Sequence, residues 1–163
     1  TFYPYFADVE AAILVLAQEM ALDGQRLVRL VAESPWKGKA GYQTALALTD
    51  AFFDFWDQRR PVLRVVDLST EEGDRRFRNI RVRLLNAVTT ELAGVVASLQ
   101  AEGKNLGVEP MAQAGTLVTT LANVAAHHYG FEFWGIRTAD VRISVARQVY
   151  WGATGQRPPT PAP

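Results

Sequence analysis

Residues 69–103 read STEEGDRRFRNIRVRLLNAVTTELAGVVASLQAEG, and they carry the strongest helical pattern in the chain. Ser69 with Glu72 three positions later forms a capping box, which predicts that a helix begins near Ser69. Gly103 predicts its end. The apolar residues between them recur every three or four positions, as on one side of a helix: Phe77, Ile80, Leu84, Val88, Leu92, Val95 and Leu99. The stretch therefore predicts one long helix with a single apolar stripe.

The same spacing continues on both sides of this stretch, and strand-like alternation is almost absent. Pro35 and Pro61 predict breaks, because proline cannot continue a helix from its interior. Gly24 marks a weak point in the first helix. The predicted helices are 8–34, 41–60, 61–66, 69–103, 110–129 and 138–151, the last with Thr138 as its N-cap. We therefore expect an all-α domain of about six helices at residues 8–152, followed by a loose, proline-rich tail at 153–163.

The composition is that of an ordinary globular domain. Its 163 residues suit one domain with a sizeable core, and the 17 basic and 17 acidic residues cancel. A chain without net charge is not expected to be the main DNA-contacting surface. There is no cysteine, which excludes disulfides and thiol ligands and fits a reducing cytoplasm. We saw no uncharged apolar run near the roughly 18 residues of a membrane span, so we expect no membrane partner.

An aromatic cluster, Thr1-Phe2-Tyr3-Pro4-Tyr5-Phe6, opens the chain just before the first apolar helix. This pattern resembles the end of the recognition helix in the TetR (tetracycline repressor) family. Residues 56–67 and 72–77 also resemble segments of TetR-type regulators, and the order and lengths of the helices agree. Val9 departs from the pattern, since the family commonly has a phosphate-binding lysine there. The alternative is an aromatic staple over a helical core.

The resemblance implies that residues 1–7 are the remnant of a helix-turn-helix whose other helices precede Thr1. Thr1, Tyr3 and Tyr5 would then touch the backbone of operator DNA, since hydroxyl-bearing side chains position a protein on phosphates. The residues that read bases would lie outside this chain. The family also implies a homodimer, with the last two helices of each subunit joined in a four-helix bundle.

The segment 111–126 contains no charged residue, although a surface helix normally shows a charged side. We expect the domain core to cover one side and a second subunit to cover the other; the alternative is that the chain's own loops and last helix cover both. Ala114 and Gly115 would allow a close approach. The predicted dimer residues on the last two helices are Thr116, Leu121, Val124, His128, Val141, Val145 and Val149.

Inward-facing aromatic residues and a second, mostly apolar side of the 69–103 helix predict a hydrophobic small-molecule pocket. The alternative is plain core packing, which is the better interpretation for any single residue. The family favours a pocket between these helices. The predicted lining residues are Tyr42, Thr49, Phe52, Phe53, Trp56, Val82, Asn86, Thr89, Leu117, Thr120 and Asn123.

We expect no catalytic residues, cofactor or metal, because no known catalytic motif appears. Asp54 and Asp57 are three residues apart, but both lie beside Gln58 and Arg59, which indicates solvated surface carboxylates. A metal role for His128 is the less common alternative to a satisfied histidine. The resemblance thus implies a ligand-responsive TetR-family repressor that releases DNA when a hydrophobic molecule binds. The rival hypotheses are a small helical enzyme or carrier, and a structural dimerisation module.

Overall fold

The computed structural model describes residues 3–160, with side chains from Ala7 onward. Thr1, Phe2 and the side chains of Tyr3 and Tyr5 lie outside this part, so the predicted DNA-contacting residues are not described. Within residues 3–160 the chain forms helices and no strand, which confirms the all-α prediction. The helices are α1 Tyr3–Asp23, α2 Gln25–Glu33, α3 Gly38–Glu71, α4 Arg75–Ala101, α5 Pro110–Glu132 and α6 Thr138–Thr154.

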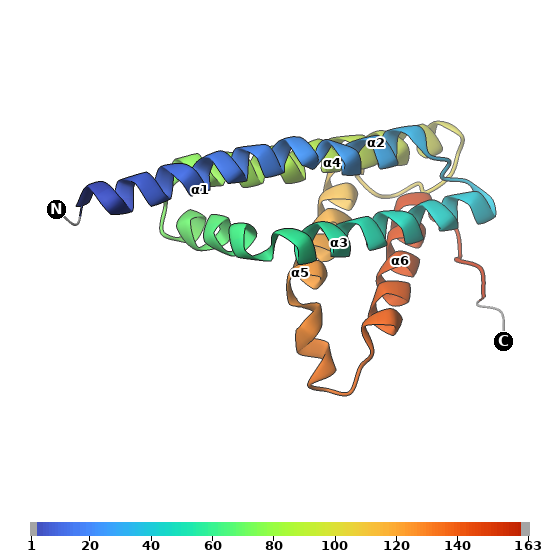
Figure 1. The fold of residues 1–163 in the computed structure, drawn as a ribbon. Coiled ribbons are helices and arrows are strands. Elements are labelled where there is room, and N and C mark those ends of the chain that lie inside the picture. The colour runs from blue at the N-terminus through green and yellow to red at the C-terminus, as the bar shows by residue number, and fades with distance from the viewer. Residues whose placement is uncertain (1–2, 161–163) are drawn as a thin grey trace.

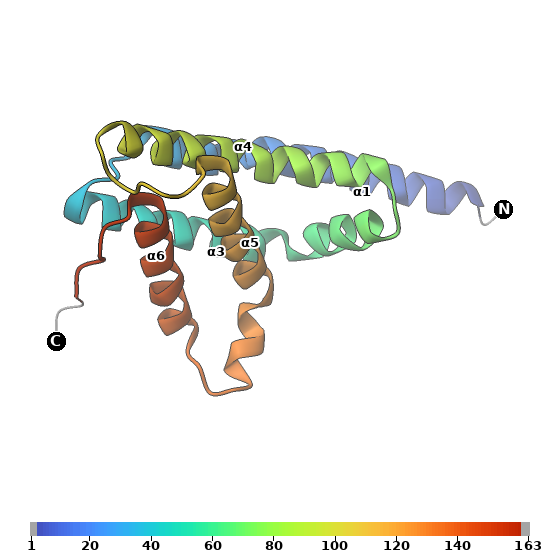
Figure 2. The same cartoon turned by 180° about the vertical axis from the view of Figure 1, so that it is seen from behind.

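The helices form two groups (Figures 1 and 2). Helices α1 and α2 lie along α4 in one layer, and α3 runs beneath them. Helices α5 and α6 form an antiparallel pair that crosses this layer steeply and extends beyond α3. The first turns of α1 extend past the ends of the other helices (Figure 1).

Gly24 separates α1 from α2, where the sequence predicted one helix with a weak point. The backbone comes so close to α4 here that a Cβ on Gly24 would lie 2.2 Å from Leu84 Cδ1. Glycine therefore allows the chain to pass close to α4 at the junction of the first two helices. The C-cap of α2, Ser34, has extended backbone angles, so the chain turns away just before Pro35.

The predicted break at Pro61 is a kink inside one helix. Arg59 has non-helical backbone angles (φ −121°, ψ 15°), two residues before the proline. Proline lacks an N–H and its ring clashes with the carbonyl four residues earlier, which explains the distortion. The kink divides α3 into a longer first part and a shorter second part, and both contribute residues to the core.

The predicted capping box is wrong. Ser69 lies in the last turns of α3, and α4 begins six residues later at Arg75. Asp74 is the actual N-cap, and its carboxylate accepts a hydrogen bond of 2.9 Å from the Arg76 N–H. Gly73 has a φ of +93°, a backbone angle that favours glycine and that ends α3. The hydrogen bond from Arg76 and, opposing it, slight burial set the pKa of Asp74 at about 2.

Two predicted features of the last helix also need correction. Thr138 is the first helical residue of α6, whose N-cap is Arg137. The tail predicted from residue 153 begins later, because α6 includes Ala153 and Thr154, both buried. Beyond the helix, Pro158 is buried and Arg147 donates a hydrogen bond of 2.6 Å to the Pro159 carbonyl. Residues 161–163 lie outside the described part.

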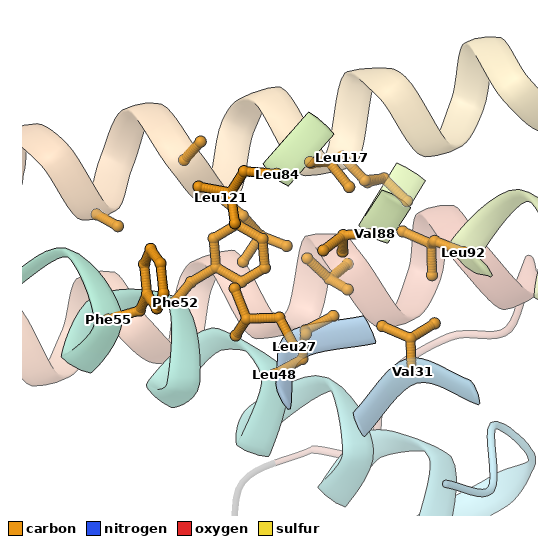
Figure 3. Packing of buried hydrophobic residues seen from close by; sticks show 14 of the residues in the cluster. Leu27, Val31, Leu48, Phe52, Phe55, Leu84, Val88, Leu92, Leu117 and Leu121 are labelled. Atoms are coloured by element: carbon orange, nitrogen blue, oxygen red, sulfur yellow. The ribbon is translucent and has the colours of Figure 1, made fainter. Parts of the chain in front are cut away.

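Apolar side chains from α2, α3, α4 and α5 point toward one another at the centre of the domain (Figure 3). The predicted stripe of the 69–103 helix is buried here, apart from the partly buried Val95. Phe52 of α3 is fully buried, and its ring stacks on Trp56 with centroids 5.6 Å apart.

By length and composition alone, α4 is the one described helix apolar enough to span a membrane. In the structure, the apolar stripe of α4 forms part of the core.

Candidate functional site

A cavity of about 520 Å³ lies between the second part of α3, the beginning of α4 and the middle of α5. This volume is within the range of small-molecule sites. Trp56 lies before the kink of α3, and Arg81 projects from α4. Helix α5 contributes Asn123, Ala126 and His127. The second part of α3 supplies the longest wall, with residues three and four positions apart: Arg60, Leu63, Arg64, Asp67, Leu68 and Glu71.

The cavity carries charges of both signs. Arg81 Nε lies 3.4 Å from Asp67 Oδ1, a loose ion pair whose side chains are both about half exposed. Burial is the main influence on Asp67 and raises the pKa of its carboxyl, with Glu71 acting in the same direction. The positive charges of Arg81 and His127 lower it by less. The site therefore differs from the apolar pocket that the sequence predicted.

A hydrogen-bonded group fixes α3 to α5 beside the cavity. Asp57 Oδ1 lies 2.8 Å from His128 Nε2 and 2.7 Å from an Arg60 nitrogen. Because an ionised carboxylate can only accept, Nε2 carries the proton. Arg60 also donates to the Ala126 carbonyl at 2.7 Å, and its guanidinium lies 4.7 Å from the centroid of the Tyr129 ring. Asp57 is thus not the solvated surface carboxylate that its polar neighbours in the sequence indicated.

Asp57→Asn is expected to lower the free energy of unfolding at pH 7 by about 1–2 kcal/mol, because it weakens charge-assisted hydrogen bonds. Burial raises the pKa of Asp57, but hydrogen bonds from His128 and Arg60 outweigh it and hold that pKa below its ordinary value. The stabilisation is therefore complete above pH ~4 and is lost as the pH falls through the lower folded-state pKa.

Urea denaturation of both proteins between pH 7 and pH 3 measures this difference, which should shrink toward the acid end. Asp54→Asn is the matched control. Asp54 lies one turn away, its side chain is 62% exposed, and its ion pair with Arg142 is 3.5 Å long. The control should lose no more than about 0.5 kcal/mol. Equal losses for the two variants would contradict the assigned role of Asp57.

The family model "Tetracyclin repressor-like, C-terminal domain" matches residues 27–160. The chain belongs to the tetracyclin repressor-like C-terminal domain family. This confirms the family and the fold that the resemblance implied. The match begins in α2, so it covers neither the aromatic opening nor α1. No curated protein and no solved structure matches the chain.

The cavity of this tetracyclin repressor-like domain includes Trp56 and Asn123 from the predicted ligand residues, and not the others. Thr49, Phe52, Phe53 and Leu117 are buried in the core, and Tyr42 packs edge-on against Tyr150. The remaining predicted residues lie at or near the surface. Thr89 and Thr120 are half-buried, with hydroxyls bonded to their own helices, whereas Val82 and Asn86 are exposed.

Most of the predicted dimer residues belong to the core of the domain. On α6, Val141, Val145 and Val149 are 7%, 4% and 1% exposed. Leu121 and His128 of α5 are also buried. They stabilise the monomer and do not reach its surface. Val124 is half-buried and Thr116 is exposed. The side of α5 that is open to a partner instead carries Ala112, Thr116, Thr119 and Asn123.

Several cavity residues were missed because the pocket was expected to have apolar walls with few hydrogen-bonding groups. The available signal was the spacing of Arg60, Arg64, Asp67 and Glu71, which places all four on one side of a helix. Leu63 and Leu68 fall on the same side. A helix side that carries both charged residues and leucines is expected to contact water as well as apolar groups, as the wall of a cavity does.

The described residues contain no group of three or more side chains suited to hold a metal ion. His128, the one residue for which a metal role was considered, bonds to Asp57 through Nε2, and its Nδ1 is buried without a hydrogen-bond partner.

Proposed function

We propose that this domain is the ligand-sensing and dimerising part of a transcriptional repressor of the TetR family. The observation that carries the proposal is the cavity of about 520 Å³ between α3, α4 and α5 in a domain of this family. A small molecule bound there would release operator DNA held by a helix-turn-helix on the amino-terminal side of α1. We infer a regulatory role rather than a catalytic one, and a cytoplasmic location, where the DNA lies.

Contacts between the cavity walls and α1 support coupling to DNA. Arg59, at the kink of α3, lies 2.9 Å from Asp23 near the end of α1. Arg76, at the beginning of α4, lies 2.5 Å from Glu10 near the other end of α1. A ligand that prefers one arrangement of α3 and α4 would therefore also favour one position of α1. Because α1 leads toward the proposed helix-turn-helix, that preference would change the distance between the two helix-turn-helix units of a dimer.

The open side of α5 supports a homodimer. Ala112, Thr116 and Thr119 are exposed, small and uncharged, and they permit another helix to approach closely. On α6, Ile143 and Trp151 are 41% and 57% exposed. We propose that these two helices pair with those of a second copy in a four-helix bundle. Two-fold symmetry would present two reading heads to a two-fold operator.

The test uses the intact regulator with its helix-turn-helix. Selection from random DNA duplexes should enrich a two-fold symmetric site, and fluorescence anisotropy should show a dimer bound to it. Adding a compound that occupies the cavity should reduce operator affinity by about tenfold, the size of a typical allosteric coupling. Failure to enrich any sequence, or an operator affinity unchanged by a compound shown to occupy the cavity, would overturn the proposal.

A further inference from the structure

The second part of α3 presents a charged side to the cavity. Arg64, Asp67 and Glu71 face the cavity together with Leu63 and Leu68. A helix side that points toward the rest of a domain is ordinarily apolar. Within a concave site, charges act on a ligand more strongly than on an open surface, because the protein walls keep part of the water away. These charges therefore bear on which ligand the cavity accepts.

Arg64 and Arg81 are the less engaged arginines of the cavity, whereas Arg60 is held by two hydrogen bonds. The guanidinium of Arg60 is engaged by Asp57 and by the Ala126 carbonyl. Arg81 has one loose contact with Asp67, at 3.4 Å. Among the described residues, Arg64 forms no ion pair within 4.0 Å. A guanidinium offers a planar fork of donors that suits a carboxylate.

Three arginines line the cavity against two acidic residues, Asp67 and Glu71. Asp67 already pairs with Arg81 at 3.4 Å, and burial raises the pKa of its carboxyl, so its negative form is less favourable there than in water. Glu71 is exposed at the end of α3, and Arg64 and Arg81 are exposed as well, so water screens part of all three charges. The ring of Trp56 and the side chain of Ala126 supply an apolar surface in the same cavity. The site thus combines available cations with an apolar wall.

We propose that the cavity binds an amphipathic carboxylate. Its anionic head lies between Arg64 and Arg81, and its apolar body lies against Trp56, Leu63 and Ala126. This inference rests on the proposed function of the cavity as the ligand site and narrows the ligand from any hydrophobic molecule to an organic acid.

The test compares matched acids, alcohols and amines by isothermal titration calorimetry on the chain itself. One set has a linear body (decanoic acid, 1-decanol, decylamine), and the other has an aromatic body (2-naphthylacetic acid and the matching alcohol and amine). In at least one set the acid should bind about tenfold more tightly than the alcohol, as expected for one charge-assisted contact. The amine should bind most weakly. Equal binding of acid and alcohol, tighter binding of the amine, or no binding by either set would overturn the proposal.

Variants test the two arginines. Arg64→Met and Arg81→Met should each weaken acid binding about tenfold and leave alcohol binding within about twofold. Arg83→Met is the matched control, because Arg83 is exposed on α4 and does not line the cavity. The control should bind the acid like the unaltered chain. Circular dichroism establishes that every variant is folded, and equal acid binding by all three variants would contradict the proposal.

Asp67→Asn should change the affinity for the acid in the direction opposite to the arginine variants. It removes a negative charge and frees Arg81, so acid binding should become tighter; a cationic ligand would bind less tightly. Binding is measured without DNA, so the two proposals fail separately. An acid that binds through Arg64 and Arg81 but leaves operator affinity unchanged would overturn the repressor function alone. Operator release by the alcohols and not by the acids would overturn the ligand class alone.

Discussion

Phe52→Ala is expected to lower the free energy of unfolding by about 3–5 kcal/mol, the usual loss for removing a buried aromatic ring. Phe52 is fully buried and stacks on Trp56, and its neighbours come from several helices (Figure 3). Since α2, α4 and α5 cannot all move inward, a cavity would remain. The loss is a large part of the 5–15 kcal/mol that typically stabilises a domain. Urea denaturation followed by circular dichroism measures it.

Val82→Ala is the control for this experiment. Val82 projects from α4 and is 55% exposed, so its loss should stay within about 0.5 kcal/mol. The comparison also tests the earlier expectation that both residues line a ligand pocket. A loss below about 1 kcal/mol for Phe52→Ala would mean that the ring borders an empty space and not a packed core.

The helices were predictable because local signals agree with one another along most of the chain. The stripe Phe77, Ile80 and Leu84 identified α4 and its buried side. The beginning of α4 was misplaced because two capping signals lie close together. Ser69 and Glu72 have the spacing of a capping box, but Gly73 followed by Asp74 ends one helix and begins the next.

The cavity was less predictable, because helical spacing shows which residues share a side and not which neighbour covers that side. Val82 and Asn86 share a side with Thr89, but the first two are exposed and only Thr89 is partly covered. Likewise, Val145 shares a stripe with two other valines of α6, and either a partner or the domain core would suit that stripe. The structure places it against α3 and α5.

The charged wall of the cavity depends on a long-range feature, the contact of α5 with α3 beside the kink, where Asp57 and Arg60 bond to His128 and Ala126. The kink at Arg59 turns that part of the helix and leaves space beneath Asn123 and His127. Pro61 indicated a break but not the direction in which the chain continues. The charged residues could therefore be placed on one side of a helix from the sequence, but not in a cavity.

Thr116→Arg is expected to weaken the proposed dimer by at least 100-fold, because like charges that meet across a two-fold interface cost several kcal/mol. Thr116 is exposed on the uncharged side of α5, and its hydroxyl bonds within its own helix to the Ala112 carbonyl. The substitution therefore leaves the monomer core intact. Analytical ultracentrifugation at micromolar concentration should show a dimer for the unaltered chain and a monomer for the variant.

Gln43→Arg is the matched control, since Gln43 is exposed on α3, which is not one of the two helices of the proposed bundle. The substitution adds the same charge there. It should remain dimeric. In the intact regulator, Thr116→Arg should also abolish operator binding at concentrations where the unaltered protein binds, because a single reading head loses the second half-site. A variant that stays dimeric would show that α5 pairs through another side or not at all. A monomeric variant that still binds the operator would separate dimerisation from DNA recognition, and the two-fold model of repression would then be wrong.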